Sequence, residues 1–216
     1  MRAAPSISVL RVLAALALFV LPRAALGLEV MHPGGPYTQA PTGMTYPETV
    51  DQFRRVNVIR YKPDGSDESA GYNDVTPMHE INMTVYVFPS PSIISIGSPQ
   101  SVIEDTRERL CRDQYETVQR EIEGAHPDAV LVEKKDISLA QAGITHTGHF
   151  ASYDLTNAKF FGRADVPSRS EAYLYCYVGG KWSVEYRIDH PRDFDAGVAI
   201  ARFMQDLAWT IPPEQN

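Results

Sequence analysis

The stretch EAYLYCYVGGKWSVEYRID, residues 171–189, constrains the fold of this chain more tightly than any other part of its sequence. Two runs of alternating side chains flank Gly179-Gly180, a pattern that predicts an antiparallel hairpin turning at the glycines. Successive side chains of a strand point to opposite faces of the sheet. One face of the first arm would therefore lie in the core. That face would carry Ala172, Leu174, Cys176 and Val178, and the opposite face Tyr173, Tyr175 and Tyr177.

Two segments have the periodicity of helices. One lies between Ser98 and Gly124, and the other begins after Asp193 or Asp195 and ends before Pro212. The apolar residues of the longer helix recur at a spacing that forms one buried stripe. The residues of this stripe are Ile103, Cys111, Tyr115, Val118 and Ile122.

Alternating runs also predict strands within the segments 53–58, 82–88, 129–139 and 144–155, whereas the segment 62–69, KPDGSDES, has the composition of a loop. Consecutive strands with only two helices predict an α+β fold. We expect a mostly antiparallel sheet, with a long central helix and a C-terminal helix packed on it.

This order of elements resembles the Mog1/PsbP-like α/β sandwich. The ending GGKWSVEYRID…FMQDLAW is similar to the close of small secreted bacterial members of that class, and SAGYND…INMTVYVFP resembles a pattern in uncharacterised secreted proteobacterial proteins. The resemblance implies a fold class without a shared catalytic centre. It therefore assigns no functional residue, because a fold alone does not give a function.

The first 27 residues have the layout of a secretory signal peptide. Arg2 and Arg11 flank the start, the apolar run VLAALALFVL follows at residues 12–21, and small residues end the segment near Gly27. The apolar run is shorter than the ~20 residues that span a bilayer, although an uncleaved anchor helix remains the alternative. We expect a periplasmic or secreted protein with no membrane span after cleavage.

The rest of the chain divides into a Pro/Gly-rich extended arm, residues 28–49, and a single globular α+β domain, residues 50–216. The whole chain has 20 Lys and Arg against 27 Asp and Glu, a net charge of −7. Loss of Arg2, Arg11 and Arg23 with the signal peptide would bring this charge to about −10. So acidic a chain is not expected to bind nucleic acid, which requires clustered basic residues.

The only two cysteines, Cys111 and Cys176, occupy a predicted helix and a predicted strand. Both would face the same core, and an oxidising compartment favours their pairing. We expect a structural disulfide between them, with a pair of buried thiols as the alternative.

Two histidines, His146 and His149, stand three residues apart in a predicted strand. Alternation would place their rings on opposite faces, whereas a metal-binding pair on a strand needs a spacing of two. A bulge at Gly148 is the one feature that would bring them together. The sequence has no Gly-x-Ser-x-Gly motif either. We therefore expect no metal, no cofactor and no catalytic residue.

The row Tyr173, Tyr175 and Tyr177 is the strongest candidate for a binding surface. If the sheet face is open, three rings in register would bind a partner; if a helix covers it, they are core. The sequence thus favours a non-catalytic, exported binding or accessory module of the bacterial envelope with a protein partner. The alternative is a small hydrolase or metal-dependent enzyme that combines His146 or His149 with carboxylates from loops.

Overall fold

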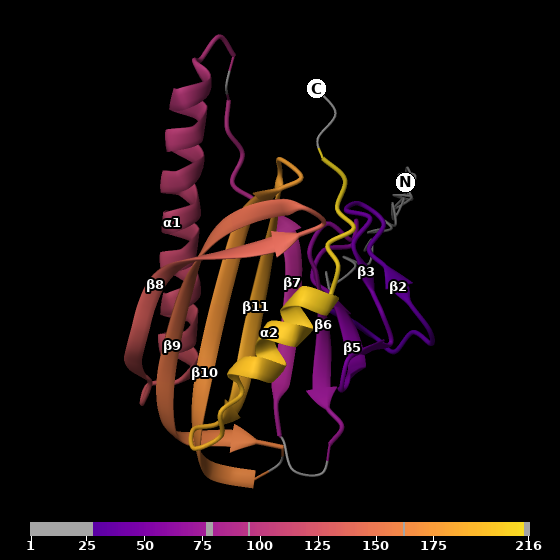
Figure 1. Ribbon diagram of the computed structural model, residues 1–216, viewed down its shortest axis with the longest axis vertical. Coiled ribbons are helices and arrows are strands. Elements are labelled where there is room, and N and C mark those ends of the chain that lie inside the picture. Colours follow the sequence, from indigo (N-terminus) through magenta and orange to yellow (C-terminus); the bar gives the residue numbers. More distant parts are fainter. Residues whose placement is uncertain (1–27, 77–79, 95, 162, 214–216) are drawn as a thin grey trace, which may run out of the picture.

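The computed structural model describes residues 28–213 except 77–79, 95 and 162 (Figure 1). The predicted signal peptide lies outside the described residues. Two helices and eleven strands make up the described chain. They are, in order, β1 (Glu29–Met31), β2 (Tyr37–Thr38), β3 (Thr45–Tyr46), β4 (Thr49–Val50), β5 (Phe53–Arg60), β6 (Glu68–Asp74), β7 (Asn82–Pro89), α1 (Gln100–Ala125), β8 (Val130–Gln141), β9 (Ile144–Phe160), β10 (Arg163–Val178), β11 (Trp182–Pro191) and α2 (Gly197–Asp206).

Nine of the strands form one sheet in the order β1-β5-β6-β7-β11-β10-β9-β8, with β4 beside β5. Every strand pairing in it is antiparallel. After β7, the helix α1 carries the chain to the far edge of the sheet, and β8 to β11 then return strand by strand to β7. The predicted α+β class with a mostly antiparallel sheet and two helices is confirmed.

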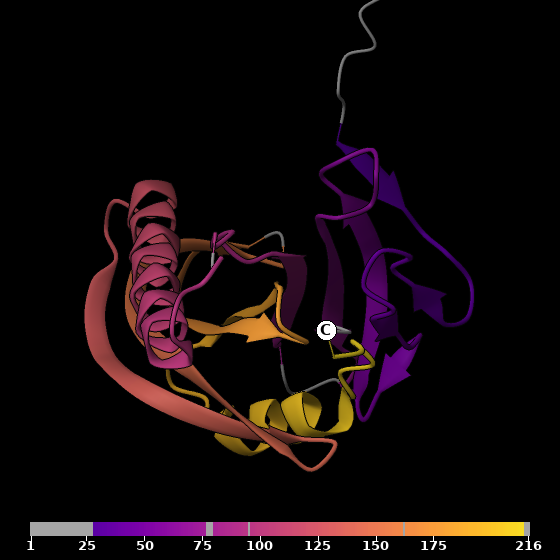
Figure 2. The same ribbon diagram turned by 90° about the horizontal axis from the view of Figure 1, so that it is seen from above.

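The two helices cover opposite sides of the central strands (Figure 2). The helix α1 packs its predicted stripe on β9 and β10, where Tyr115 donates a hydrogen bond of 2.6 Å to the carbonyl of Phe150. Side chains that point to this side alternate along the strands. The buried cluster contains Cys111, Tyr115, Val118, Ile122, Ala151, Tyr153, Leu155, Ala172 and Leu174.

The second and larger core lies under α2. Phe203 of α2 is fully buried and meets the ring of Tyr72 edge-on, with 5.1 Å between the ring centroids. One face of β11 is buried here, since Val184, Tyr186 and Ile188 are all inaccessible to solvent. The segment 28–49 joins the same core through Met44 and Tyr46, both with 0% exposure, and its strand β1 pairs with β5.

One strand occupies a segment in which no strand is predicted. The residues of β6 are almost all buried between β5 and β7, although the sequence ESAGYND lacks β-branched side chains. A Cβ added at Gly71 would lie 2.6 Å from Oδ1 of Asn57, so glycine permits the close approach of β5 at this point. The loop predicted over residues 62–69 therefore extends too far, because residues 68 and 69 already belong to β6. Neither helix of the described chain is long and apolar enough to cross a membrane.

Candidate functional site

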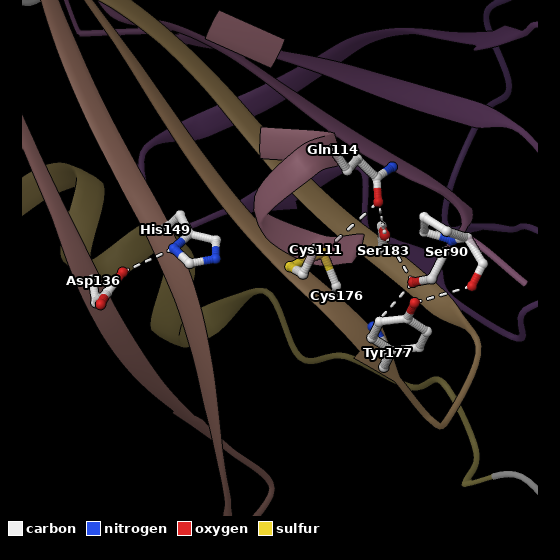
Figure 3. Close-up of a disulfide and its surroundings, with 9 residues drawn as sticks. Ser90, Cys111, Gln114, Asp136, His149, Cys176, Tyr177 and Ser183 are labelled. Carbon is white, nitrogen blue, oxygen red and sulfur yellow. Dashed lines mark hydrogen bonds and ion pairs between the residues drawn. A yellow bond between two sulfur atoms is a disulfide. The ribbon is translucent and has the colours of Figure 1, made fainter. Parts of the chain in front are cut away.

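A disulfide joins Cys111 of α1 to Cys176 of β10, as predicted (Figure 3). The two Cα atoms lie 5.8 Å apart, and 65 residues separate the cysteines in sequence. The bond ties the first half of the long helix to the sheet. It also fixes the backbone immediately before Tyr177.

The row of three tyrosines is broken at Tyr177. The pairing of β10 with β11 shifts between Tyr175 and Val178, and Tyr177 has a φ of 57°. An extra residue in a strand resets the alternation of its side chains. Tyr175 and Val178 therefore lie in the core under α2, whereas Tyr177 packs against the cluster under α1. The prediction that all three tyrosines share one face is wrong for this reason.

The three tyrosine rings therefore lie in different surroundings. Tyr175 is 2% exposed and packs edge-on against Trp209. Tyr173 is partly buried beside Phe150, with 4.7 Å between the ring centroids. Burial raises the pKa of both phenols. Binding by the row as a whole stays a prediction, and of the three tyrosines Tyr177 has the most open surroundings.

The backbone N–H and the side-chain hydroxyl of Tyr177 both donate hydrogen bonds. Its N–H donates to Oγ of Ser90 at 3.0 Å, and its hydroxyl donates to the carbonyl of Pro91 at 3.0 Å (Figure 3). The guanidinium carbon of Arg107 lies 5.1 Å from the centroid of its ring. This distance is within the range of a cation–π contact. Tyr177 thus fixes the place of the arginine.

A cleft of about 920 Å³ opens beside this pair. It lies between the first turns of α1, the β8–β9 turn, the β10–β11 turn and the segment after α2. Two smaller hollows, of about 640 and 410 Å³, adjoin it, and Arg107 and Tyr177 line all three. The side chains that line the largest of the three hollows include Ile103, Arg107, His146, Tyr177, Trp209 and Ile211. We call this largest hollow the Arg107 cleft.

One hydrogen-bond donor of Arg107 has no acceptor among the described residues. Its Nη2 donates to the carbonyl of Gly180 at 3.4 Å, but its Nε is buried and has no hydrogen-bond partner in the described part of the chain. A buried polar atom without a partner costs free energy and is rare in native proteins. The nearby acids of α1 are engaged elsewhere: Glu104 accepts from Gln100, and Glu108 pairs with Arg112 at 2.8 Å.

The far wall of the Arg107 cleft is aromatic. The rings of His146 and Trp209 lie 4.9 Å apart, and Nε1 of Trp209 donates to the hydroxyl of Tyr186 at 2.7 Å. That hydrogen bond fixes the indole at the base of the cleft. Burial lowers the pKa of His146, which favours its neutral form. Arg107 is therefore the principal cation of the lining.

The second histidine points the other way, as alternation predicts. His149 stacks on Tyr115 under α1, and its Nδ1 lies 2.9 Å from Oδ1 of Asp136. The bulge considered at Gly148 is absent, since this residue pairs with Ile137 in regular register. Among the residues described, no group of three His, Cys, Asp or Glu side chains is placed to hold a metal.

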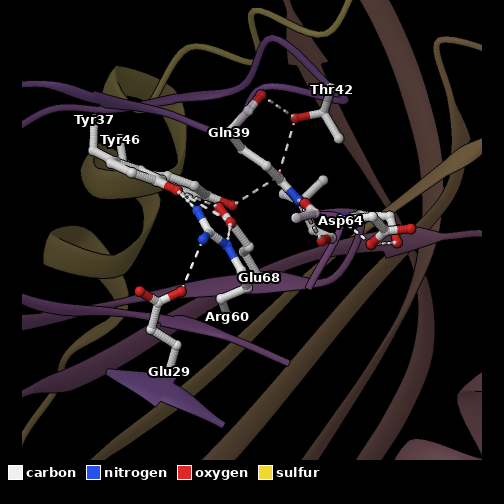
Figure 4. Close-up of polar contacts among 11 residues, drawn as sticks. Glu29, Tyr37, Gln39, Thr42, Tyr46, Arg60, Asp64 and Glu68 are labelled. Atoms are coloured by element: carbon white, nitrogen blue, oxygen red, sulfur yellow. Dashed lines mark hydrogen bonds and ion pairs between the residues drawn. The ribbon is translucent and has the colours of Figure 1, made fainter. Parts of the chain in front are cut away.

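A separate polar cluster joins the segment 28–49 to the sheet (Figure 4). The carboxylate of Glu68 is 1% exposed, and it accepts from Nε of Arg60 at 2.7 Å and from the hydroxyl of Tyr37 at 3.0 Å. Arg60 also pairs with Glu29 at 2.8 Å. The hydrogen bonds to Glu68 and Tyr37 raise the pKa of Arg60, and both carboxylate oxygens of Glu68 accept hydrogen bonds. The cluster therefore links the segment 28–49 to the sheet, and its buried carboxylate is paired within the described part of the chain.

The position of Arg107 in the sequence is itself a signal of a site. Arg107 stands four residues after Ile103 and four before Cys111, within the buried stripe of α1. A charged residue at an apolar position of a helix marks either a buried pair or a site. His146, Tyr177 and Trp209 come from distant segments, and only the fold brings them to this arginine.

Comparison with models of known protein families gives no match, and no curated protein matches the chain.

Proposed function

We propose that this protein is a non-catalytic, exported binding module of the bacterial envelope and that the Arg107 cleft is its binding site. The observation that carries the proposal is the buried Nε of Arg107, which has no partner among the described residues and lies beside an open cleft. Sites for small ligands combine apolar walls with a few polar groups that fix orientation. The Arg107 cleft has this composition.

The proposed compartment is the periplasm or the extracellular space, reached through the signal peptide of residues 1–27. A disulfide between Cys111 and Cys176 fits such a compartment, since oxidising conditions are needed to maintain it. The order of strands and helices is compatible with the proposed Mog1/PsbP-like assignment. That resemblance implies no shared catalytic centre, which agrees with a binding role.

The alternative, a small hydrolase or metal-dependent enzyme, rests on the pair His149–Asp136. A histidine and the carboxylate that orients it are two of the three members of a catalytic triad. However, no Ser, Thr or Cys donates to His149 among the described side chains, and both cysteines are bonded to each other. Asp136 belongs to β8 and not to a loop. A nucleophile within hydrogen-bond reach would be needed for this function.

Crosslinking in the native envelope tests the proposal. Mature protein with a photoreactive side chain in place of Ile144, which is 58% exposed, would place the crosslinker in the lining of the Arg107 cleft. The same group in place of Val198, which is 64% exposed on α2, is the matched control. We expect a reproducible adduct from position 144 alone. Equal adducts from both positions, or stoichiometric metal together with esterase activity in the purified protein, would contradict it.

A further inference from the structure

We infer that the ligand of the Arg107 cleft is a monoanion, a carboxylate attached to a flat apolar body. The inference rests on the proposed binding function and names the chemistry of its ligand. Three observations support it: the free donor of Arg107, the charge of the lining, and the aromatic far wall.

The first observation concerns the geometry of the guanidinium. A carboxylate binds an arginine side-on through two parallel hydrogen bonds, one of them from Nε. In Arg107 the Nε is buried without a partner in the part of the chain that is described, and Nη2 makes one long contact of 3.4 Å with Gly180. The guanidinium carbon lies 5.1 Å from the centroid of the Tyr177 ring, which packs against it. A carboxylate would satisfy the donor that the protein leaves unfilled, once a rotation of the guanidinium turns the buried Nε toward the cleft.

The second observation concerns charge. The described residues that line the Arg107 cleft include no Asp or Glu, although the whole chain has a net charge of −7. The adjoining hollow of about 640 Å³ has three acids in its lining, Glu104, Glu108 and Asp136. An anion is therefore attracted to the cleft and repelled from its neighbour. A single arginine suits one negative charge, whereas a phosphate dianion is usually met by several cations.

The third observation concerns shape. Trp209, Ile211 and Ile103 provide apolar surface within the same cleft as Arg107. The indole of Trp209 is 7% exposed and is fixed by its hydrogen bond to Tyr186, so the surface that it presents to the cleft is rigid and apolar. A volume of about 920 Å³ lies within the ~300–1,000 Å³ of ordinary ligand sites. An aryl carboxylate or the C-terminal carboxylate of a peptide with an aromatic last residue would each fit this chemistry.

Matched probes of equal shape test the inference by calorimetry on the mature protein. We expect 2-naphthoate to bind at least about tenfold more tightly than 2-naphthamide, because a hydrogen bond to a charged partner is the stronger kind. Acetyl-Ala-Ala-Phe with a free or an amidated C-terminus separates a peptide source from a free organic acid. Preference for the free-acid peptide over naphthoate assigns the peptide, and the reverse assigns the small acid.

Variants connect the charge preference to Arg107. The substitution Arg107→Gln should abolish the tenfold preference, and Arg107→Lys should retain only part of it because an ammonium cannot bind a carboxylate side-on. Arg112→Gln is the matched control, since this arginine of α1 is exposed and pairs with Glu108. Circular dichroism and thermal unfolding establish that each variant folds, and the comparison of acid with amide in the unmodified protein needs no variant.

Each contrary outcome has a distinct meaning. Equal binding of naphthoate and naphthamide would overturn the anion inference while leaving the cleft as a binding site. Tighter binding of inorganic phosphate than of either carboxylate would replace the carboxylate by a phosphate ligand and also overturn it. If none of the probes binds and the crosslink from position 144 is absent as well, both the inference and the proposed function fail.

Discussion

Reduction of the Cys111–Cys176 disulfide is expected to lower the free energy of unfolding by about 4 kcal/mol. The magnitude follows from the 65 residues that separate the two cysteines. In the chain-entropy treatment, a crosslink across a loop of this length removes about 14 cal/mol/K from the unfolded chain, or about 4 kcal/mol at 25 °C. A loss of this size is a large fraction of the ~5–15 kcal/mol that stabilises a typical domain.

Urea unfolding followed by tryptophan fluorescence measures this loss, with and without a reductant. The double variant Cys111→Ala, Cys176→Ala is the matched control, because its unfolding should not respond to the reductant. Cys176 directly precedes Tyr177, so reduction should also weaken the binding of 2-naphthoate. A difference below about 1 kcal/mol between the oxidised and reduced protein, or a double variant that itself responds to reductant, would refute the reasoning.

Two further predictions test the packing of β9 and the environment of His146. Gly148→Ala should destabilise the protein by about 1–3 kcal/mol in urea unfolding, since the added Cβ would lie 2.4 Å from the carbonyl oxygen of Leu174 and 2.7 Å from the ring of Tyr175. Gly124→Ala in α1, where an added Cβ meets nothing within 4 Å, should instead be neutral or stabilising by up to about 1 kcal/mol; equal losses from both would contradict the packing described. Burial lowers the pKa of His146 from its ordinary 6.5, so the folded state favours the neutral ring. The stability that this preference contributes is present above pH 6.5 and is lost as the pH falls below 6.5. The unfolding free energy of the unmodified protein should fall more steeply from pH 6.5 to 5 than that of His146→Gln, and parallel slopes would show that His146 does not titrate differently on folding.

Local sequence patterns predicted the parts of the fold that depend on turn residues or on a regular spacing of apolar side chains. The glycine pair of the hairpin does form its turn, with φ of 59° at Gly179 and 93° at Gly180. Four of the five residues in the predicted stripe of α1 are buried, and Cys111 is among them. Such features depend on neighbours close in sequence, so periodicity is enough to find them.

Features that depend on distant neighbours were not predictable in the same way. The irregularity in β10 at Tyr177 has no signature in an alternating run, and it moves one ring of the tyrosine row to the other side of the sheet. The strand β6 is buried because β5 and β7 pair on both of its sides, which its own composition does not reveal. The Arg107 cleft joins four segments of the chain, so only the arginine within the α1 stripe pointed to it.

The most direct test of the account is the side-chain NMR signal of Arg107 Nε–H, assigned by its loss in Arg107→Lys and followed during titration with 2-naphthoate. A donor that gains a carboxylate partner should move markedly downfield with naphthoate and stay in place with 2-naphthamide. If naphthoate binds with no change in this signal, Arg107 does not hold the ligand, and the site proposed for this protein is wrong.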